Sequence, residues 1–448
     1  MSNRAGTEPH SLYAIVGLSV NVCVLDCPGE DTSSPSAQED RPLPEHAALL
    51  PIDEAQARLL ALLPTLPEET VEVEAALGRG PVETVLARRT LPPWDNSAMD
   101  GFAVRRGDLT GGEVELPVVR TVHAGDPSGP PLPAGAAVRI MTGAPLPPGA
   151  DAVVKQEDTS APSEGRVRFP ASAASVGFVR RRGEEVREGA PLIPAGTGLG
   201  LAEAGLLWAQ GILEVRVPRR PKVALISTGD ELCRPDEAPL GRIVDTNLPV
   251  LAAALRRAGA EVVFTGHAPD EPERVRALLE QAATADLVLS TAGVSVGARD
   301  HVRPCLEAMG VALDFWRVAL KPGKPLVVGR RGQTVFLGLP GNPTSALVTF
   351  ELFVRPALRR MLGHERPFPT PVPGRLDGRY TKPAGLTHLV RVATAFREGA
   401  LWATPLRTQS SGTLASSAGA THLMKVPSDV CSLDEGAPVE LAPLEWRW

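Results

Sequence analysis

Three loops of this 448-residue chain carry glycines, two lysines, hydroxyl groups and a carboxylate. Each loop follows an apolar, β-prone run, at residues 287–289, 311–320 and 335–337. In an open α/β sheet the carboxyl ends of the strands form the binding crevice, so we expect the three loops to meet at one edge of a sheet. Glycine turns at helix starts receive phosphate groups, and lysines attract them. The spacing therefore predicts a site for a phosphorylated, anionic ligand.

The first loop joins an expected strand to an expected helix. Gly293, Ser295 and Gly297 would let its backbone approach an anion, although a structural turn would use the same glycines. Asp300 follows, and a carboxylate beside a phosphate repels it unless a divalent cation bridges the two, which predicts Mg²⁺. Asp300 is also suited to cap the helix, and the two roles are compatible.

The second and third loops add cations and a helix start. Lys321 and Lys324 flank a Pro-Gly pair, so their ammonium groups can face one dianion; two solvated surface lysines are the alternative. In the third loop two prolines stiffen a turn in which Asn342 can pair with the edge of a heterocycle. Ser345 opens the helix expected at 344–362, where a hydroxyl and the helix N-terminus favour an oxyanion.

Further polar groups follow other expected strands. Asp230 and Glu231 come after a Thr-Gly pair at a strand end, which suits an adenosine- or metal-facing role as well as a capped turn. Asp100 and Thr142 lie on tight turns of a region rich in short β-like runs. Such turns are typical of a lid over a site, but ordinary turn chemistry would use the same residues.

The composition narrows the class of protein. The net charge of −6 comes from 46 basic and 52 acidic residues that are well mixed, and the absence of a basic stripe argues against nucleic-acid binding. Five scattered cysteines form neither a disulfide framework nor a zinc site, which favours a reducing compartment. The apolar stretch 13–25 is too short and too polar to span a bilayer and lacks the features of a signal peptide. We expect a cytoplasmic protein that does not bind to a membrane.

The length predicts three or four domains. Downstream of Pro221, strands alternate with helices of about ten residues, which predicts a parallel, doubly wound α/β sheet. Helical patterns at 53–63, at 71–86 with an interruption at 78–81, and at 202–209 surround a β-rich module, and Pro356 should kink the last helix of the α/β domain. The expected organisation is a disordered N-terminal extension (1–46), a discontinuous linker domain (47–88 and 187–219), a β-rich lid (89–186), the α/β domain (220–366) and a C-terminal β domain (367–448).

Eight motifs in order resemble the MoeA family, the molybdopterin molybdenumtransferases related to the E domain of gephyrin. The motifs are DNSAMDGFAVR, MTGAPLPPGADAVV, RRRGE, STGDEL, DTN, GVSVGARD, LKPGKP and GLPGNPTSA. The resemblance covers roughly residues 50–448. It implies a linker domain, an inserted lid, a molybdopterin-binding α/β domain and a C-terminal β-barrel-like domain. It also implies a homodimer whose active site combines the α/β domain of one chain with the lid of the other.

The reaction that the resemblance implies inserts molybdate into adenylylated molybdopterin, and yields molybdenum cofactor and AMP with Mg²⁺ present. Residues matched to catalytic groups of the family are Asp100, Thr142, Glu231, Asp270, Asp300 and Lys321. Residues matched to molybdate binding are Lys321, Lys324, Ser345 and Arg391. Substrate contacts are expected from Gly293, Ser295, Gly297, Pro340, Gly341, Asn342 and Ser411, and metal ligands from Asp300 and Glu231. The expected partners are adenylylated molybdopterin and molybdate, and the adenylyltransferase of the pathway and apo-molybdoenzymes are further candidates.

Four positions depart from the family pattern. Glu185 stands where Asp is usual, Arg317 where Lys is common, and Phe102 where Tyr is common. Ala292 replaces a common Gly, and its Cβ would restrict the loop if the position requires a positive φ. Two alternative functions remain. An adenylyltransferase-like nucleotide-binding enzyme would lack the lid, linker and tail domains, and a non-catalytic scaffold such as gephyrin would not need intact acids and lysines.

Overall fold

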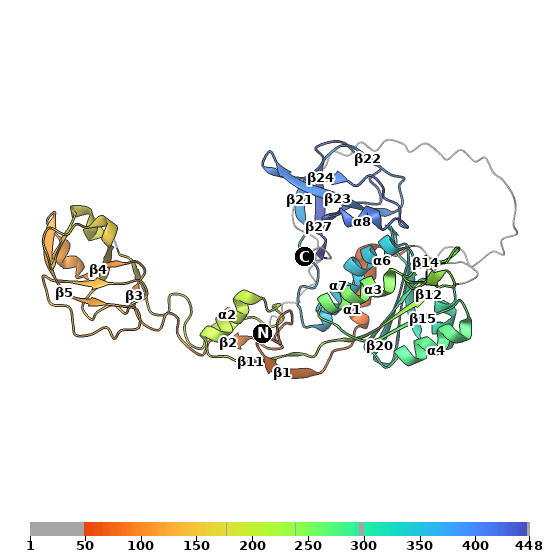
Figure 1. The fold of residues 1–448 in the computed structure, drawn as a ribbon, viewed down its shortest axis with the longest axis horizontal. Helices are drawn as coiled ribbons and strands as arrows, with labels where there is room; N and C mark the ends of the chain where they lie inside the picture. Colours follow the sequence, from red (N-terminus) through yellow and green to blue (C-terminus); the bar gives the residue numbers. More distant parts are fainter. Residues whose placement is uncertain (1–48, 176, 238, 295–299, 446–448) are drawn as a thin grey trace, which may run out of the picture. The chain divides into compact units, whose positions relative to one another are not determined.

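The computed structural model describes residues 49–175, 177–237, 239–294 and 300–445. These residues form two compact units, of which the first lies within Met1–Pro67 and Pro218–Trp448 and the second is Glu68–Val217. Figure 1 shows the fold and labels many of the helices and strands of both units. The first unit contains an α/β domain and a small β domain, and the second unit is rich in short strands.

A six-stranded sheet forms the centre of the α/β domain. Its strand order is β15 (Glu261–Ala268), β12 (Lys222–Thr228), β16 (Leu287–Thr291), β20 (Thr334–Leu339), β19 (Pro325–Arg331) and β17 (Ala312–Arg317). The first four strands are parallel, as the predicted α/β class requires. The sheet is not parallel throughout, because β19 runs antiparallel to both of its neighbours. The sequence did not predict the tight hairpin that β19 forms with β20.

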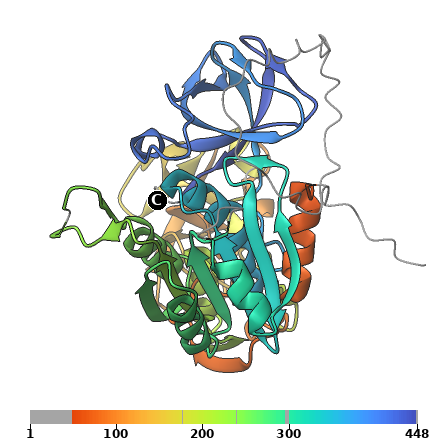
Figure 2. The ribbon, with the colours of Figure 1, turned by 90° about the vertical axis from the view of Figure 1, so that its right-hand side faces the viewer.

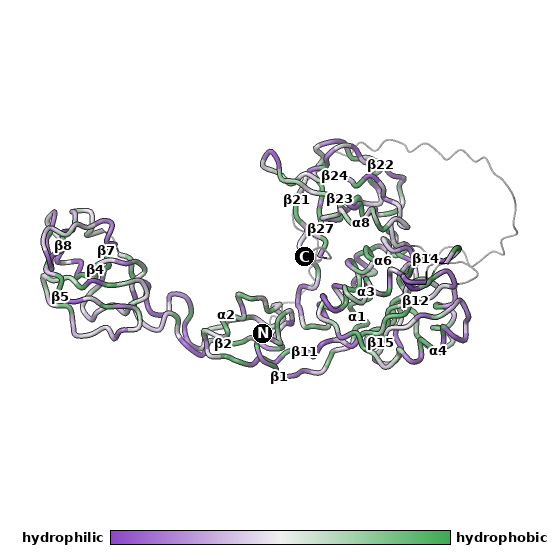
Figure 3. Tube along the Cα trace, viewed as in Figure 1, coloured by the Kyte–Doolittle hydropathy of each residue, from purple (hydrophilic) through white to green (hydrophobic). Residues whose placement is uncertain are grey.

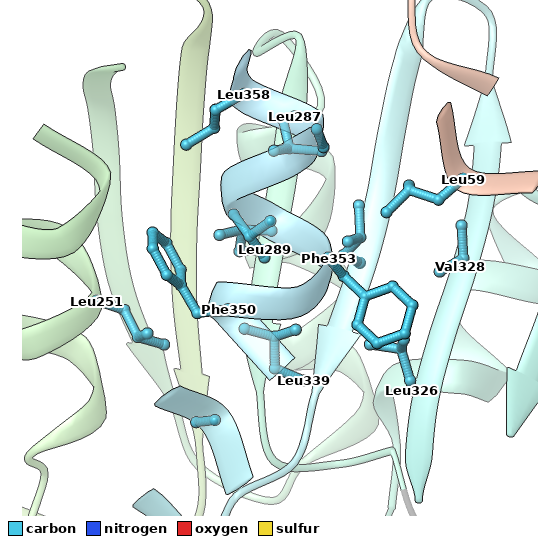
Figure 4. Close-up of a cluster of buried hydrophobic side chains, with 14 of the residues drawn as sticks. Leu59, Leu251, Leu287, Leu289, Leu326, Val328, Leu339, Phe350, Phe353 and Leu358 are labelled. Atoms are coloured by element: carbon cyan, nitrogen blue, oxygen red, sulfur yellow. The ribbon is translucent and has the colours of Figure 1, made fainter. Parts of the chain in front are cut away.

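Alternating side chains bury both faces of this sheet. Val223 and Leu225 of β12 belong to one buried cluster, whereas Ala224 and Ile226 belong to another. Helices cover both clusters, which is why β12 is apolar along most of its length. Figure 4 shows Leu59 in the first cluster. The first cluster is covered by α1 (Ile52–Leu62), α3 (Asn247–Arg257), α6 (Pro343–Thr349) and α7 (Arg355–Met361), and the second by α4 (Pro272–Ala282) and α5 (Val302–Ala308).

Helix α1 packs in the α/β domain, although the predicted boundaries group it with the linker residues 47–88. Its apolar side chains Ile52, Ala55 and Leu59 belong to the first cluster. Figure 2 shows α1 beside the sheet, and the N-terminal segment of the first unit accordingly extends to Pro67. The sequence showed an amphipathic helix but not its partner, because hydrophobic periodicity specifies a face and not the surface that covers it.

The helix predicted at 344–362 is present, with a local change of winding. A π-helical segment, Phe350–Val354, joins α6 to α7, and Pro356 lies in the first turn of α7. Proline lacks the N–H that would bond to the carbonyl four residues earlier, and a wider turn directly before it accommodates this loss. The disruption expected near Pro356 therefore takes the form of a π-helical segment.

The C-terminal β domain is a closed barrel of five strands in the residues that the structure describes, as predicted. Its strands, in order, are β23 (Thr387–Arg397), β24 (Ala400–Pro405), β21 (Val372–Leu376), β27 (Pro438–Pro443) and β25 (His422–Val426), and β25 pairs again with β23. A short strand of the α/β domain, β18 (Leu320–Lys321), pairs in parallel with β23. In this pairing Lys321 lies opposite His388, so the barrel is joined to the α/β domain at a predicted site residue.

The second unit contains a five-stranded sheet. Its order is β7 (Ala152–Lys155), β4 (Gly101–Val104), β6 (Ala137–Ile140), β5 (Val114–Val122) and β8 (Arg166–Phe169). The β-like runs of the sequence at 114–122, 137–141, 152–156 and 167–169 correspond to β5, β6, β7 and β8, whereas β4 was not predicted. The same unit contains the pairs β1 (Glu68–Glu72) with β11 (Glu214–Pro218) and β2 (Val85–Leu86) with β10 (Pro191–Ile193), and the helix α2 (Leu201–Ala209).

The helical pattern expected at 71–86, with an interruption at 78–81, does not form a helix. Turns follow β1 as far as Gly78, whose φ of 79° lies outside the helical region, and the segment ends in strand β2. Val71 packs in a cluster with strand residues of the same unit. The two ends of the segment pair instead with other strands, β1 with β11 and β2 with β10, and tertiary packing routinely outweighs local propensity.

None of the helices within the described ranges is long and apolar enough to cross a membrane. Figure 3 shows hydrophobic and hydrophilic residues interspersed along the trace of both units. Many of the apolar residues are in strands and helices that bury them in compact clusters.

Candidate functional site

Two of the three predicted loops line one cavity in the first unit. This first cavity has a volume of about 570 Å³ and is lined by all five residues of the KPGKP loop, 321–325. Asn342 and Ser345 of the third loop also line it. Strands β17 and β20 both run antiparallel to β19, so the loops that follow them lie at the same edge of the sheet. The prediction that these loops meet is therefore confirmed.

Cations and hydroxyl groups line the first cavity. Lys321 and Lys324 are among its residues, and no Asp or Glu occurs among the described residues that line it. Gly323 permits the turn between the lysines, because its φ is 110° and an added Cβ would lie 2.5 Å from Cγ2 of Thr349. Ser345 lies in the first turn of α6 and is only 3 % exposed. Such a surface favours a tetrahedral anion.

Sequence reasoning missed His388 and Tyr380, which line the first cavity from the barrel domain. The hydroxyl of Tyr380 lies 2.9 Å from Nδ1 of His388. Burial, together with the charges of Lys321 and Lys382, lowers the pKa of His388 to about 4. His388 directly precedes the β-like run 389–396 of the C-terminal domain, and this position is the one signal that could have found it.

Arg391 is fully buried and does not line the first cavity. Its Nη2 donates hydrogen bonds to the carbonyl oxygens of Thr408 (3.3 Å) and Ser410 (3.1 Å), and its backbone N–H donates to Oε1 of Gln409 (3.0 Å). These bonds hold in place the loop that contains Ser411, and Ser411 lines the first cavity. Burial lowers the pKa of Arg391 from the usual arginine value. Its direct contact with molybdate stays a prediction.

A second cavity of about 580 Å³ adjoins the first and shares Pro325, Pro340 and Asn342 with it. Nδ2 of Asn342 donates a hydrogen bond to Oγ of Ser411 at 3.0 Å, so a predicted pair of substrate-binding residues is in direct contact. The first and third loops meet here, at the carboxyl ends of β16 and β20. The other lining residues with predicted roles are Glu231, Gly293, Asp300 and Gly341.

The oxygen atoms in the second cavity fit Mg²⁺. Glu231, Asp245 and Asp300 line it. Thr228 and Thr291 are 2 % and 1 % exposed and line it too, and their hydroxyl oxygens have no hydrogen-bond partner among the described residues. No group of three His, Cys, Asp or Glu side chains in the described part of the chain is placed to hold a metal ion. Mg²⁺ usually keeps several waters and binds through one or two carboxylates and substrate phosphates, so this set of donors suits it.

Asp270 does not line the second cavity. Its backbone N–H donates to Oδ1 of Asp230 at 3.1 Å, and the Asp230 N–H lies 3.4 Å from Oδ2 of Asp270. This reciprocal pair ties the turn that carries Glu231 to the loop after β15. The structure thus gives Asp270 a positioning contact, and its catalytic role stays a prediction.

Ala292 adopts the backbone conformation that favours glycine. Its φ is 70°, as is that of Gly293. An added Cβ on Gly341 would lie 3.0 Å from Cβ of Ala292, so the two loops approach each other closely at these residues. The predicted substrate-binding residues Ser295 and Gly297 lie outside the described residues.

Asp100 and Thr142 lie together in the second unit. Oδ1 of Asp100 accepts hydrogen bonds from the backbone N–H and from the hydroxyl of Thr142, both at 2.7 Å. These bonds lower the pKa of Asp100, and the charge of Arg139 adds to the effect. The pairing of β4 with β6 brings the two residues together, because Gly101 lies opposite Ile140. The pair is exposed and presents a carboxylate of fixed orientation.

Three family models match the chain. They are the MoeA N-terminal region (domain I and II) at residues 50–211, a probable molybdopterin binding domain at 224–360 and the MoeA C-terminal region (domain IV) at 373–444. The molybdopterin molybdenumtransferase of Haemophilus influenzae is 38% identical over 323 residues, which cover 71% of this chain and 79% of that protein. The protein of the same name from Bacillus subtilis is 32% identical over 414 residues, which cover 89% and 96%.

Solved structures show the same relationship. The molybdopterin biosynthesis MoeA protein of Pyrococcus horikoshii superimposes with a TM-score of 0.73 at 27% identity, over 88% of this chain and 100% of that one. A second MoeA structure from the same genus gives a TM-score of 0.66 at 33% identity, over 89% and 99%. The matches extend over nearly the full length of these proteins and follow the order of the motifs. The chain therefore belongs to the MoeA family.

Proposed function

We propose that the chain is a molybdopterin molybdenumtransferase, which inserts molybdate into adenylylated molybdopterin and releases AMP. The observation that carries this proposal is the first cavity, where Lys321, Lys324 and Ser345 converge and no carboxylate occurs among the described lining residues. The adjoining cavity adds acids for a substrate that contains a pyrophosphate. Relatives that share most of the chain carry this name.

The two cavities have complementary chemistry. The ammonium groups of Lys321 and Lys324 would bind and orient the molybdate dianion, and the hydroxyl of Ser345 would complete the set of donors. Asn342 lines both cavities and would contact the substrate where it passes from one to the other. The sulfur ligands of molybdenum belong to the substrate, so the protein needs no cysteine cluster for this reaction.

Mg²⁺ is the cofactor of this proposal. Glu231 and Asp300 would hold it, and when bound it would neutralise the charge that develops on the pyrophosphate. The hydroxyl groups of Thr228 and Thr291 line the second cavity and would donate hydrogen bonds to the substrate. Chelation of Mg²⁺, or the Asp300→Asn substitution, should therefore lower AMP release.

The decisive experiment measures AMP release from adenylylated molybdopterin. The purified protein with Mg²⁺ should release AMP only when molybdate is present, and the product should reconstitute an apo-molybdoenzyme. Lys321→Ala should lower the rate by about 10²–10³-fold, because it removes a donor to the reacting anion. Lys222→Ala is the matched control, since Lys222 is exposed at the start of β12 and lines neither cavity.

Two results would contradict this function. AMP release that does not depend on molybdate, together with synthesis of the adenylylated substrate from ATP, would favour an adenylyltransferase. The absence of release from correctly folded protein would favour a scaffold.

We also propose that the chain forms a homodimer and acts in the cytoplasm. The first part is supported by the family resemblance, and the second by the scattered cysteines, which suit a reducing compartment. Light scattering should give twice the mass of the chain, and a monomeric mass at assay concentration would contradict the dimer.

A further inference from the structure

The first cavity contains a titratable pair to which the proposed function assigns no role. His388 lines it, is 7 % exposed, and lies opposite Lys321 in the register of β18 and β23. Tyr380 lines the same cavity from β22 (Tyr380–Thr381). The pair therefore lies beside the lysines to which the oxyanion is assigned.

The contact between Tyr380 and His388 suits both charge states of the imidazole. The hydroxyl of Tyr380 is 2.9 Å from Nδ1 of His388. Burial raises the pKa of Tyr380, so its hydroxyl keeps its proton. This hydroxyl donates to Nδ1 when the imidazole is neutral, and its oxygen accepts from Nδ1–H when the imidazole is protonated. Nε2 takes no part in this bond in either state.

Five cations lie on the elements around His388: Lys321 and Lys324 in the KPGKP loop, Lys382 beside β22, Arg391 on β23 and Lys425 on β25. Burial and the charges of Lys321 and Lys382 lower the pKa of His388 to about 4. Without an anion, His388 is therefore neutral near pH 7. A dianion bound beside the same lysines would oppose their effect, because a nearby negative charge favours the protonated imidazole.

We propose that His388 is a further oxyanion-binding residue of the first cavity, and that it takes up a proton when a tetrahedral dianion binds beside Lys321 and Lys324. The identification of this dianion as molybdate rests on the proposed function. Once protonated, His388 adds a charge-assisted hydrogen bond to those of the lysines. Tyr380 is the positioning residue, because its hydroxyl holds Nδ1 in both states.

The direction of the pH dependence follows from linkage. The bound dianion raises the pKa of His388 above its value of about 4 in the free protein. Between the pKa values of the free and bound states, binding consumes a proton, so the affinity falls as the pH rises through this window. Above the pKa of the bound state His388 stays neutral, and only the lysines contribute charge.

Titration calorimetry in two buffers of different ionisation enthalpy measures the protons taken up on binding. Molybdate is the main probe, and sulfate is the second because it does not change its own protonation between about pH 5 and pH 8. The full-length wild type should take up a fraction of a proton and bind more weakly as the pH rises. His388→Asn should take up none, and a shift of one pKa unit would make it bind about tenfold more weakly below the pKa of about 4 of the free protein, with a smaller difference at higher pH.

His422→Asn is the matched control. His422 lies on the neighbouring strand β25, and burial lowers its pKa as well. Its Nδ1 is 3.0 Å from Oγ1 of Thr421, and it lines neither cavity. This variant should therefore keep the wild-type affinity and proton uptake. Tyr380→Phe keeps the imidazole but removes the acceptor for Nδ1–H, so its proton uptake should fall.

The outcomes separate this proposal from the proposed function. Loss of proton uptake in His388→Asn and a decrease in Tyr380→Phe, with His422→Asn unchanged, would support the role of His388. Absence of proton uptake in the wild type, or uptake that is equal in all four proteins, would overturn it even if AMP release is intact. Wild-type protein that binds both anions with proton uptake but releases no AMP would refute the transferase and leave the role of His388 standing.

Discussion

Ala292 holds its backbone in a conformation that glycine adopts without strain. Its φ of 70° costs an L-residue about 1–2 kcal/mol. The residue lines the second cavity, and its N–H donates to the carbonyl oxygen of Leu339 at 3.2 Å. The hydrogen bond and the close approach of Gly341 fix the loop on both sides. Strain of this kind persists where surrounding structure determines the conformation, as is common beside functional sites.

Ala292→Gly should relieve this strain. The free energy of unfolding of the first unit should rise by up to about 1 kcal/mol, because the relief exceeds the added entropy of an unfolded glycine. Ala283→Gly is the matched control, since Ala283 has an ordinary φ of −68° and should lose about 0.5–1 kcal/mol. Urea unfolding of the two variants measures both effects. An equal decrease in the free energy of unfolding of the two variants would show that the backbone at residue 292 carries no strain.

The KPGKP loop depends on the elements that hold it. Gly323 approaches α6 so closely that a Cβ would lie 2.5 Å from Cγ2 of Thr349 and 3.0 Å from Cδ1 of Leu320. Gly323→Ala should displace the loop, lower the affinity for molybdate at least about tenfold, and cost about 1–3 kcal/mol of stability. Calorimetric titration and urea unfolding measure the two quantities.

Gly332→Ala is the control for this substitution. Gly332 also has a positive φ, of 59°, but a Cβ there would meet no atom within 4 Å. It lies in the hairpin between β19 and β20 and lines neither cavity. This variant should lose about 1 kcal/mol of stability and keep its affinity. Unchanged affinity in Gly323→Ala would mean that the position of the loop does not determine anion binding.

The parts of the fold that the sequence predicted are those with strong local signals. Strands β12, β16 and β20 were visible because burial on both faces makes them largely apolar, whereas the edge strand β15 alternates between exposed and partly buried residues. Strand β4 was missed, although it is as long as β6, β7 and β8, because its four residues continue a segment dense in polar side chains. The interrupted helical pattern at 71–86 did not form a helix, because it was weaker than the pairings of β1 with β11 and of β2 with β10 at its two ends.

At the candidate site, too, only residues with a local sequence signal could be predicted. The convergence of Lys321, Lys324 and Ser345 could be predicted, because each follows a strand that ends at the same edge of the sheet. His388 could not, because it reaches the cavity through the pairing of β18 with β23. These strands are two and eleven residues long and belong to different domains, and no periodicity in either segment specifies such a partner.

Each of the two units contains buried apolar clusters of its own. The α/β domain and the barrel supply those of the first unit, and β5, β6 and α2 contribute to those of the second. Domains with separate cores usually unfold as separate cooperative units, and a single melting temperature is then not well defined. We therefore expect scanning calorimetry to resolve at least two transitions.

Asp286 provides a test of this separation. Its carboxylate accepts hydrogen bonds at 2.7 Å from Nη1 and Nη2 of Arg219 and from the N–H of Lys222. Asp286→Asn should lower the free energy of unfolding of the first unit by about 1–3 kcal/mol and leave the transition of the second unit unchanged. Leu116 lies in a buried cluster of the second unit. Leu116→Ala should lower the free energy of unfolding of the second unit by about 2–4 kcal/mol and leave the transition of the first unit unchanged.

The pH dependence of the Asp286 effect identifies its cause. Burial raises the pKa of Asp286, but the hydrogen bonds from Arg219 and Lys222 outweigh burial and leave the pKa below its usual value. The stabilisation is therefore complete above the unfolded-state pKa of about 4 and is lost as the pH falls through the lower pKa of the folded state. The difference between wild type and Asp286→Asn should be constant near neutral pH and shrink only in acid. If both transitions moved together in either variant, the two units would unfold as one, and this expectation would be wrong.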